Sequence, residues 1–163
     1  MDTKKIRLSV LDQSPVRKGI IAEQAVKETV ELAKYTDQLG YTRFWVSEHH
    51  NTGTLAGSTP EVLIAHLASQ TTNIRIGSGG VMMPNHSVLK VAENFRMLEA
   101  IAPGRIDLGM GRAPGTDRLT AAMLNPSNQF REQDFIEQLY DLINYFHDRG
   151  DPGTPVSKIR DIP

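Results

Sequence analysis

Apolar residues along this chain follow two spacings in turn, and the alternation predicts strands followed by helices. Four short apolar stretches bounded by turn-forming residues have the composition of strands, at residues 6–11, 44–46, 74–77 and 105–109. Four longer stretches repeat apolar residues every three or four positions, the spacing of one helix face, at residues 22–39, 60–72, 88–101 and 135–146. The predicted order is therefore a strand and a helix, repeated four times.

The sequence also marks where some of these elements begin and end. Before the second helix, Ser58, Pro60 and Glu61 offer a capping hydroxyl, a proline in the first turn and a glutamate three residues after the serine. Ser87 is a candidate cap for the third helix, and His86 beside it is expected to assist. A long polar loop is expected before the fourth helix, and irregular structure at the end of the chain.

Strands that alternate with helices form a parallel sheet with right-handed crossovers, as either an open doubly wound sheet or a barrel. An eightfold barrel typically needs about 250 residues, so four such units would make half of one. The 163 residues of the chain are enough for one domain with its own core. We therefore expect an α/β fold in residues 1–150 and a Pro/Gly-rich irregular tail in residues 151–163.

Charge and composition narrow the classes of function. Lys and Arg number 18 against 19 Asp and Glu, a net charge of −1, whereas a nucleic-acid-binding protein needs a basic excess to neutralise phosphates. The absence of cysteine excludes disulfides, thiolate metal sites and a cysteine nucleophile, and it fits a reducing compartment. Neither a secretory signal nor an apolar run of membrane-spanning length occurs. The expectation is a cytoplasmic protein without nucleic-acid or membrane partners.

In a parallel α/β fold, functional groups gather on the loops after the carboxyl ends of the strands. Four segments occupy that edge, at residues 12–15, 47–57, 77–86 and 109–116. The second holds Glu48, His49 and His50, which are suited to acid/base chemistry or metal binding. Because neighbouring side chains at a strand end point to opposite sides, both histidines are not expected to reach one ion. We predict no metal site, with one histidine lining an active site and the other making structural hydrogen bonds.

The third and fourth segments combine glycines with one cation. Gly79 and Gly80, where the third strand leaves the sheet, permit close approach of a flat ligand or an unusual dihedral, or they form a plain bulge. Their spacing does not match a dinucleotide-binding fingerprint. Arg112 is suited to a ligand phosphate or carboxylate, or it pairs with Asp107 or Asp117.

Together these segments resemble the bacterial luciferase-like family of flavin-dependent monooxygenases. The resemblance rests on LDQSP, SEHHN and the long stretch IGSGGVMMPNHSVLKVAENFRMLEAIAPGRIDLGMGRAPG. The family fold is an eight-stranded TIM barrel that binds reduced flavin mononucleotide (FMN) at its C-terminal face and activates molecular oxygen on the flavin. The resemblance thus implies a flavoprotein oxidoreductase that oxygenates a small organic substrate and receives reduced FMN from a separate reductase.

The resemblance also implies roles for single residues. His49 matches the catalytic histidine, and Arg112 matches the arginine that contacts the flavin phosphate. Gly79 and Gly80 match a pair that often forms a non-proline cis peptide beneath the isoalloxazine ring. Gly111 stands where the luciferase α chain has a reactive cysteine, which argues against light emission but leaves Gly111 a cofactor-binding candidate.

Other residues of these segments receive lesser roles. Glu48, Asn85 and Ser14 are candidates for the lining of the pocket, whereas Trp45 is expected in the core.

Family members are roughly twice as long as this chain, so the resemblance implies that residues 1–150 are the N-terminal half of such a barrel, and we expect a truncated form. A four-stranded half-barrel would leave two strand edges and an apolar interior exposed to water. One interpretation is a half-barrel derived from the enzyme that pairs with a second copy as a homodimer. A second is a non-catalytic or vestigial flavin-binding module, and a weaker third is an oxidoreductase that uses a deazaflavin.

Overall fold

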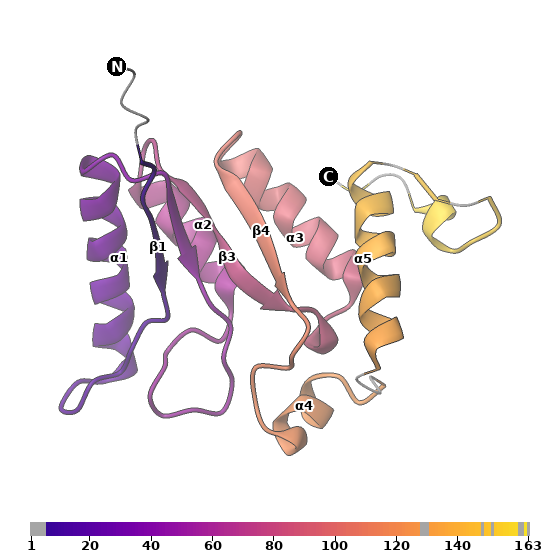
Figure 1. The fold of residues 1–163 in the computed structure, drawn as a ribbon, viewed down its shortest axis with the longest axis horizontal. Helices are drawn as coiled ribbons and strands as arrows, with labels where there is room; N and C mark the ends of the chain where they lie inside the picture. The colour runs from indigo at the N-terminus through magenta and orange to yellow at the C-terminus, as the bar shows by residue number, and fades with distance from the viewer. Residues whose placement is uncertain (1–5, 128–130, 148, 151, 160–161, 163) are drawn as a thin grey trace.

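The chain forms a four-stranded parallel sheet with α2 and α3 behind it in the view of Figure 1. The structure, a computed structural model, describes residues 6–127, 131–147, 149–150, 152–159 and 162. In chain order the elements are β1 (Ser9–Asp12), α1 (Ala22–Gln38), β2 (Arg43–Val46), α2 (Pro60–Gln70), β3 (Arg75–Met82), the 3-10 turn η1 (Met83–Asn85), α3 (Val88–Ile101), β4 (Ile106–Gly111), α4 (Arg118–Leu124), α5 (Glu132–Phe146) and the 3-10 turn η2 (Val156–Lys158). Each strand pairs with the next one in sequence, so the predicted α/β fold with a parallel sheet is confirmed.

One set of alternate strand positions packs against the helices and makes the core. Phe44 and Val46 of β2 and Ile76 of β3 are buried together with Ile64 and Leu67 of α2. Burying a side chain of this size stabilises the fold by roughly 1.5–3 kcal/mol. The core side of β4 is the one that its alternation predicts: Ile106, Leu108 and Met110.

The other set of alternate positions faces away from α2 and α3, and we call it the open face. It carries Leu11, Arg43, Trp45, Arg75, Gly79, Asp107, Gly109 and Gly111. The expectation of an apolar interior is wrong for this face, because much of it is charged or glycine, although Leu11 is 57% exposed. The expectation that Trp45 lies in the core is also wrong, because its indole is only half-buried.

Asp107 gathers the charges of the open face. Its Oδ2 accepts hydrogen bonds of 3.0 Å from Nε of Arg43 and from Nε1 of Trp45. Its Oδ1 accepts one of 2.8 Å from Nε of Arg75. Burial would raise the pKa of Asp107, but the hydrogen bonds from Arg75 and Trp45 outweigh it and hold that pKa below its ordinary value. A single carboxylate therefore joins three strands on the open face.

At the amino edge of the sheet, side chains tie one β-α unit to another. The carboxylate of Asp37 in α1 accepts hydrogen bonds from three successive backbone N–H groups, those of residues 72–74, at 2.7, 3.1 and 2.8 Å. Burial would raise the pKa of Asp37, but these three donors outweigh it and lower the pKa. Arg105 donates to the carbonyl oxygen of Ala68 at 2.6 Å and to that of Ile74 at 3.3 Å. These bonds use no residue of the loops at the opposite edge.

Several element boundaries differ from the sequence prediction. The predicted polar loop contains α4, whose N-cap Asp117 accepts a hydrogen bond from N–H of Thr120 at 3.0 Å. β3 runs on to Met82 instead of ending at the glycines. Thr59, not Ser58, is the N-cap of α2, and its side chain makes no capping bond.

The tail expected to be irregular contains η2, and Val156 within it is buried. Residues 151, 160, 161 and 163 of that tail lie outside the described residues. Among the helices that the structure describes, none combines the length and the apolar character needed to cross a membrane.

Candidate active site

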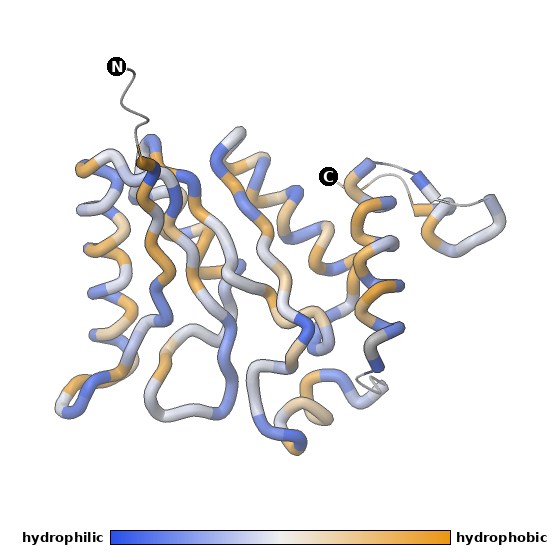
Figure 2. Tube along the Cα trace, in the orientation of Figure 1, coloured by the Kyte–Doolittle hydropathy of each residue, from blue (hydrophilic) through white to orange (hydrophobic). Residues whose placement is uncertain are grey.

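The carboxyl ends of all four strands point to one edge of the sheet, the lower edge in Figure 1, where the loops lie. Figure 2 shows hydrophilic residues along the segment that leaves β2. Backbone hydrogen bonds join this segment to both neighbours: N–H of Val16 donates to the carbonyl of Thr54 at 2.7 Å, and N–H of His50 to that of Gly115 at 3.2 Å. The predicted convergence of the segments after β1, β2 and β4 is therefore present.

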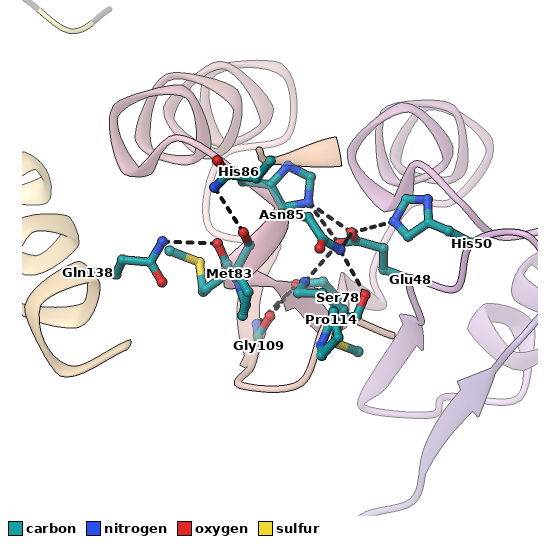
Figure 3. A network of polar contacts seen from close by, with 12 residues as sticks. Glu48, His50, Ser78, Met83, Asn85, His86, Gly109, Pro114 and Gln138 are labelled. Atoms are coloured by element: carbon teal, nitrogen blue, oxygen red, sulfur yellow. Dashed lines mark hydrogen bonds and ion pairs between the residues drawn. The ribbon is translucent and has the colours of Figure 1, made fainter. Parts of the chain in front are cut away.

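Glu48, predicted as a pocket residue, is the centre of a buried polar network (Figure 3). Its Oε1 accepts hydrogen bonds from Nε2 of His50 at 2.7 Å, from Nε2 of His86 at 2.9 Å and from Nδ2 of Asn85 at 3.1 Å. Its Oε2 accepts one from the backbone N–H of Met82 at 2.7 Å. An ionised carboxylate only accepts hydrogen bonds, so both imidazoles hold their Nε2 protons toward Glu48.

Burial and hydrogen bonding oppose each other in this network. Burial would raise the pKa of Glu48, but the hydrogen bonds from His86, His50 and the Met82 N–H outweigh it and lower that pKa. Burial would lower the pKa of His86, but its hydrogen bond to Glu48 and the negative charges of Glu48 and Glu61 raise it instead. The network therefore favours a carboxylate at Glu48 and a cation at His86.

Stability should depend on pH through the pair of Glu48 and His86. The contribution of Glu48, whose pKa is lowered, is present above its ordinary value of 4.5 and is lost as the pH falls through the folded value. The contribution of His86, whose pKa is raised, is full below its ordinary value of 6.5 and is lost as the pH rises through the folded value.

We therefore expect the free energy of unfolding, measured by urea denaturation, to fall by about 1 kcal/mol between about pH 6 and pH 9. His86→Gln keeps a hydrogen-bond donor but cannot become a cation, so the free energy of unfolding of this variant should fall less over that range. An equal fall in both proteins would contradict the pairing.

His49, predicted as the catalytic histidine, has different partners from His50. Its Nδ1 lies 3.2 Å from Oγ of Ser47, and its backbone N–H donates to the carbonyl of Gly57 at 2.8 Å. Sequence reasoning missed Ser47, although its position two residues before His49 places both on the same side of the chain. A Cβ at Gly57 would lie 2.9 Å from the carbonyl oxygen of Ser47, so this turn requires glycine. Each imidazole thus has its own set of hydrogen-bond partners.

The Gly79–Gly80 peptide bond is cis, as the family resemblance implied. The register between β3 and β4 shifts between Ser78 and Val81, so the glycine pair also lies in an irregularity of the ladder. Oγ of Ser78 donates to the carbonyl of Gly109 at 2.8 Å and accepts from its N–H at 3.1 Å. The serine hydroxyl therefore satisfies the backbone groups of Gly109 where the ladder is interrupted.

Arg112 lies exposed directly after β4, next to Gly111, which is half-buried. The two carboxylates considered as its partners both bind other groups. Asp107 binds the arginines of the open face, and Oδ2 of Asp117 accepts from Nδ2 of Asn51 at 2.9 Å. Hydrogen bonds from Thr120 and Asn51 keep the pKa of Asp117 well below its ordinary value.

The remaining predicted residues have structural partners. Ser14 has a φ of 50° and is buried, with its Oγ 2.9 Å from Oγ1 of Thr29. Asn85 donates to Glu48 and, at 2.8 Å, to the carbonyl of Pro114. The expectation that His86 helps to cap α3 is wrong, because its ring binds Glu48. Within the described ranges, no group of three or more His, Asp or Glu side chains is placed to hold a metal ion.

The chain is similar in sequence to known monooxygenases. The family model for luciferase-like monooxygenases matches residues 6–138. N-acetyl-S-alkylcysteine monooxygenase from Bacillus subtilis (strain 168) is 51% identical over 139 residues, which are 82% of this chain and 41% of that protein.

Two solved structures share the fold. The crystal structure of apo-MsnO8 has a TM-score of 0.86 at 42% identity, over 96% of this chain and 47% of that one. The oxygenating constituent of 3,6-diketocamphane monooxygenase from Pseudomonas putida, a type II Baeyer–Villiger monooxygenase in complex with FMN, has a TM-score of 0.72 at 23% identity, over 85% of this chain and 39% of that one. The chain spans about half the length of the curated relatives it matches.

Proposed function

The chain belongs to the luciferase-like monooxygenase family, and on that premise we propose that it carries part of the active site of a flavin-dependent monooxygenase. In the proposed reaction, one atom of molecular oxygen enters a small organic substrate, and the other is reduced to water with two electrons from reduced FMN, which a separate reductase supplies. The four β-α units correspond to about half of the TIM-barrel fold of this family. The proposed activity therefore requires a second half-barrel beside this one.

The observation that carries the proposal is a strip of backbone without side chains on the open face. Gly79 of β3 and Gly109 and Gly111 of β4 lie along it, with His49 on the segment that leaves the neighbouring strand β2 and Arg112 directly after β4. A Cβ at Gly79 would lie 2.9 Å from Cδ1 of Leu11 and 3.1 Å from Cε3 of Trp45, so these two side chains rest against the glycine backbone. Glycine gives a flat group this close access to the backbone. A flavin ring would take this place from the two side chains.

Two residues of this chain have distinct parts in the proposal. The guanidinium of Arg112 would hold the phosphate of FMN, because its planar donors match phosphate oxygens. His49 would hold or donate a proton at Nε2, since its Nδ1 already faces Ser47. When bound, reduced flavin supplies the electrons for oxygen activation, whereas the protein supplies binding, orientation and protons.

Titration with FMN and with riboflavin tests this assignment. Trp45 is the single tryptophan of the chain and lies on the open face, so its fluorescence reports binding there. We expect Arg112→Ala to raise the Kd for FMN about tenfold or more, because a charge-assisted contact with phosphate is lost. The Kd for riboflavin, which lacks the phosphate, should stay within about twofold.

Arg118→Ala, which removes an exposed cation from the start of α4, is the matched control and should leave both Kd values unchanged. Equal losses for FMN and riboflavin would remove Arg112 from the phosphate, and absence of saturable binding would contradict the proposal. Binding without oxygen consumption would favour a non-catalytic flavin-binding module, and preference for a deazaflavin would favour hydride transfer.

The proposal also includes a homodimer. Among the described strands, β1 and β4 each pair on one side only, and such edges can accept another strand. A second copy could use them to close the sheet. Sedimentation velocity at micromolar concentration tests this part, and a monomer would contradict it.

A further inference from the structure

The proposed chemistry does not use Glu48, yet this residue joins several of the segments that make up the site. From the end of β2 it reaches the end of β3, where it accepts from N–H of Met82 at 2.7 Å and from the ring of His86 at 2.9 Å. It also accepts from Asn85 at 3.1 Å, and Asn85 donates in turn to the carbonyl of Pro114 at 2.8 Å. The contacts of Glu48 thus extend to the segment after β4.

His50 makes a second link to that same segment. Its ring binds Glu48 at 2.7 Å, and its backbone N–H donates to the carbonyl of Gly115 at 3.2 Å. Its own carbonyl accepts from Oγ1 of Thr116 at 3.1 Å. The segment that begins with Arg112 is therefore held by two residues, Asn85 and His50, which both bind Glu48.

We propose that Glu48 is a positioning residue of the active site, whose carboxylate fixes the relative placement of the segments that carry His49, the Gly79–Gly80 pair and Arg112. The proposal rests on the proposed function for the roles of those residues. The contacts themselves account for the choice of side chain. Four N–H groups converge on Glu48, and a carboxylate accepts all of them without a donor of its own. A glutamine would set its own N–H₂ group against these donors.

Hydrogen–deuterium exchange of the free chain, followed by mass spectrometry of peptides, tests the placement without any flavin. In Glu48→Gln we expect peptides that cover residues 80–86 and 113–117 to exchange about tenfold faster or more, since charge-assisted bonds are lost. Peptides of α1 should not change. Glu23→Gln is the matched control, because it makes the same substitution on an exposed carboxylate of α1. Uniform acceleration throughout the chain would show a role in global stability only and would overturn the proposal.

Asn85→Ala gives a second test that leaves Glu48 in place, should Glu48→Gln fail to fold. It removes the bridge from Glu48 to Pro114 and leaves the bonds from His50, His86 and Met82 to Glu48, so residues 113–117 should exchange faster while α1 keeps its protection. With Arg112 misplaced, the Kd for FMN should rise about fivefold or more while that for riboflavin stays unchanged. Unchanged hydrogen exchange at residues 113–117 would overturn the proposal, regardless of the Kd measured for FMN.

The two proposals fail in different ways. Local acceleration in Asn85→Ala, together with an Arg112→Ala variant that shows no preference between FMN and riboflavin, would support the positioning role of Glu48 and remove the phosphate-binding role of Arg112. A loss of FMN affinity but not of riboflavin affinity in Arg112→Ala, without local acceleration in Asn85→Ala, would support the phosphate-binding role of Arg112. It would also remove the positioning role of Glu48.

Discussion

We expect Gly80→Ala to lower the free energy of unfolding by about 3 kcal/mol or more, because the new methyl group has no space. An ideal Cβ at Gly80 would lie 2.9 Å from the backbone carbon and oxygen of Gly109 and from the backbone carbon of Met110. Real Cβ atoms avoid such distances, and a strand backbone cannot move aside as a flexible side chain can. The sheet must therefore separate between β3 and β4 or lose its hydrogen bonds there.

Urea denaturation, followed by circular dichroism, measures this effect. Gly53→Ala is the matched control, because a Cβ there meets nothing within 4 Å and its φ is not positive. That variant should be neutral or slightly stabilising, since alanine restricts the unfolded chain. If the two variants had the same stability, the close approach of β3 and β4 would be contradicted.

The second large effect is expected for Asp107→Ala, which should lower the free energy of unfolding by about 2–3 kcal/mol. This figure allows for the partial exposure of the two arginines. The variant would leave Arg43 and Arg75 without their shared acceptor, and the indole of Trp45 without its partner. Two guanidinium groups would then face each other on the open face. Trp45 fluorescence should also change, because the indole N–H loses its hydrogen bond.

Glu31→Ala is the control for the loss of a carboxylate. Glu31 pairs with Lys34 on the exposed surface of α1 at 2.9 Å, a kind of pair that contributes at most about 1 kcal/mol. If Asp107→Ala lowered the free energy of unfolding as little as Glu31→Ala does, the charged groups of the open face would be hydrated by water and would not depend on their bonds to Asp107.

The order of the elements was predictable because helix periodicity and turn residues are local signals. Residues 22–39 were expected to form a helix, and α1 spans Ala22–Gln38. The end of β3 was not predictable in this way, since the same glycines that signal a loop also let two strands approach closely. α4 was missed although Asp117, with a threonine three residues later, gives a capping signal.

The site was predictable where strand alternation decides it. Alternation indicated different surroundings for His49 and His50, and the structure gives them different partners. The partners of Glu48 could not be predicted, because Met82 and Asn85 lie 34 and 37 positions away in the sequence and reach it only through the pairing of β2 with β3. The sequence around Glu48 would fit equally well a carboxylate that lines a pocket.

The side-chain hydrogen bonds at the amino edge hold the sheet together without using residues of the candidate active site. Asp37 lies in the last turn of α1, where a negative charge opposes the helix dipole, yet it binds the backbone that leads into β3. Arg105 joins the start of β4 to the end of α2 in a similar way. Because these bonds involve none of the carboxyl-edge loops, the exposed part of the segment after β2, at residues 51–54, can diverge between relatives or be exchanged by design while the sheet beneath it keeps its shape.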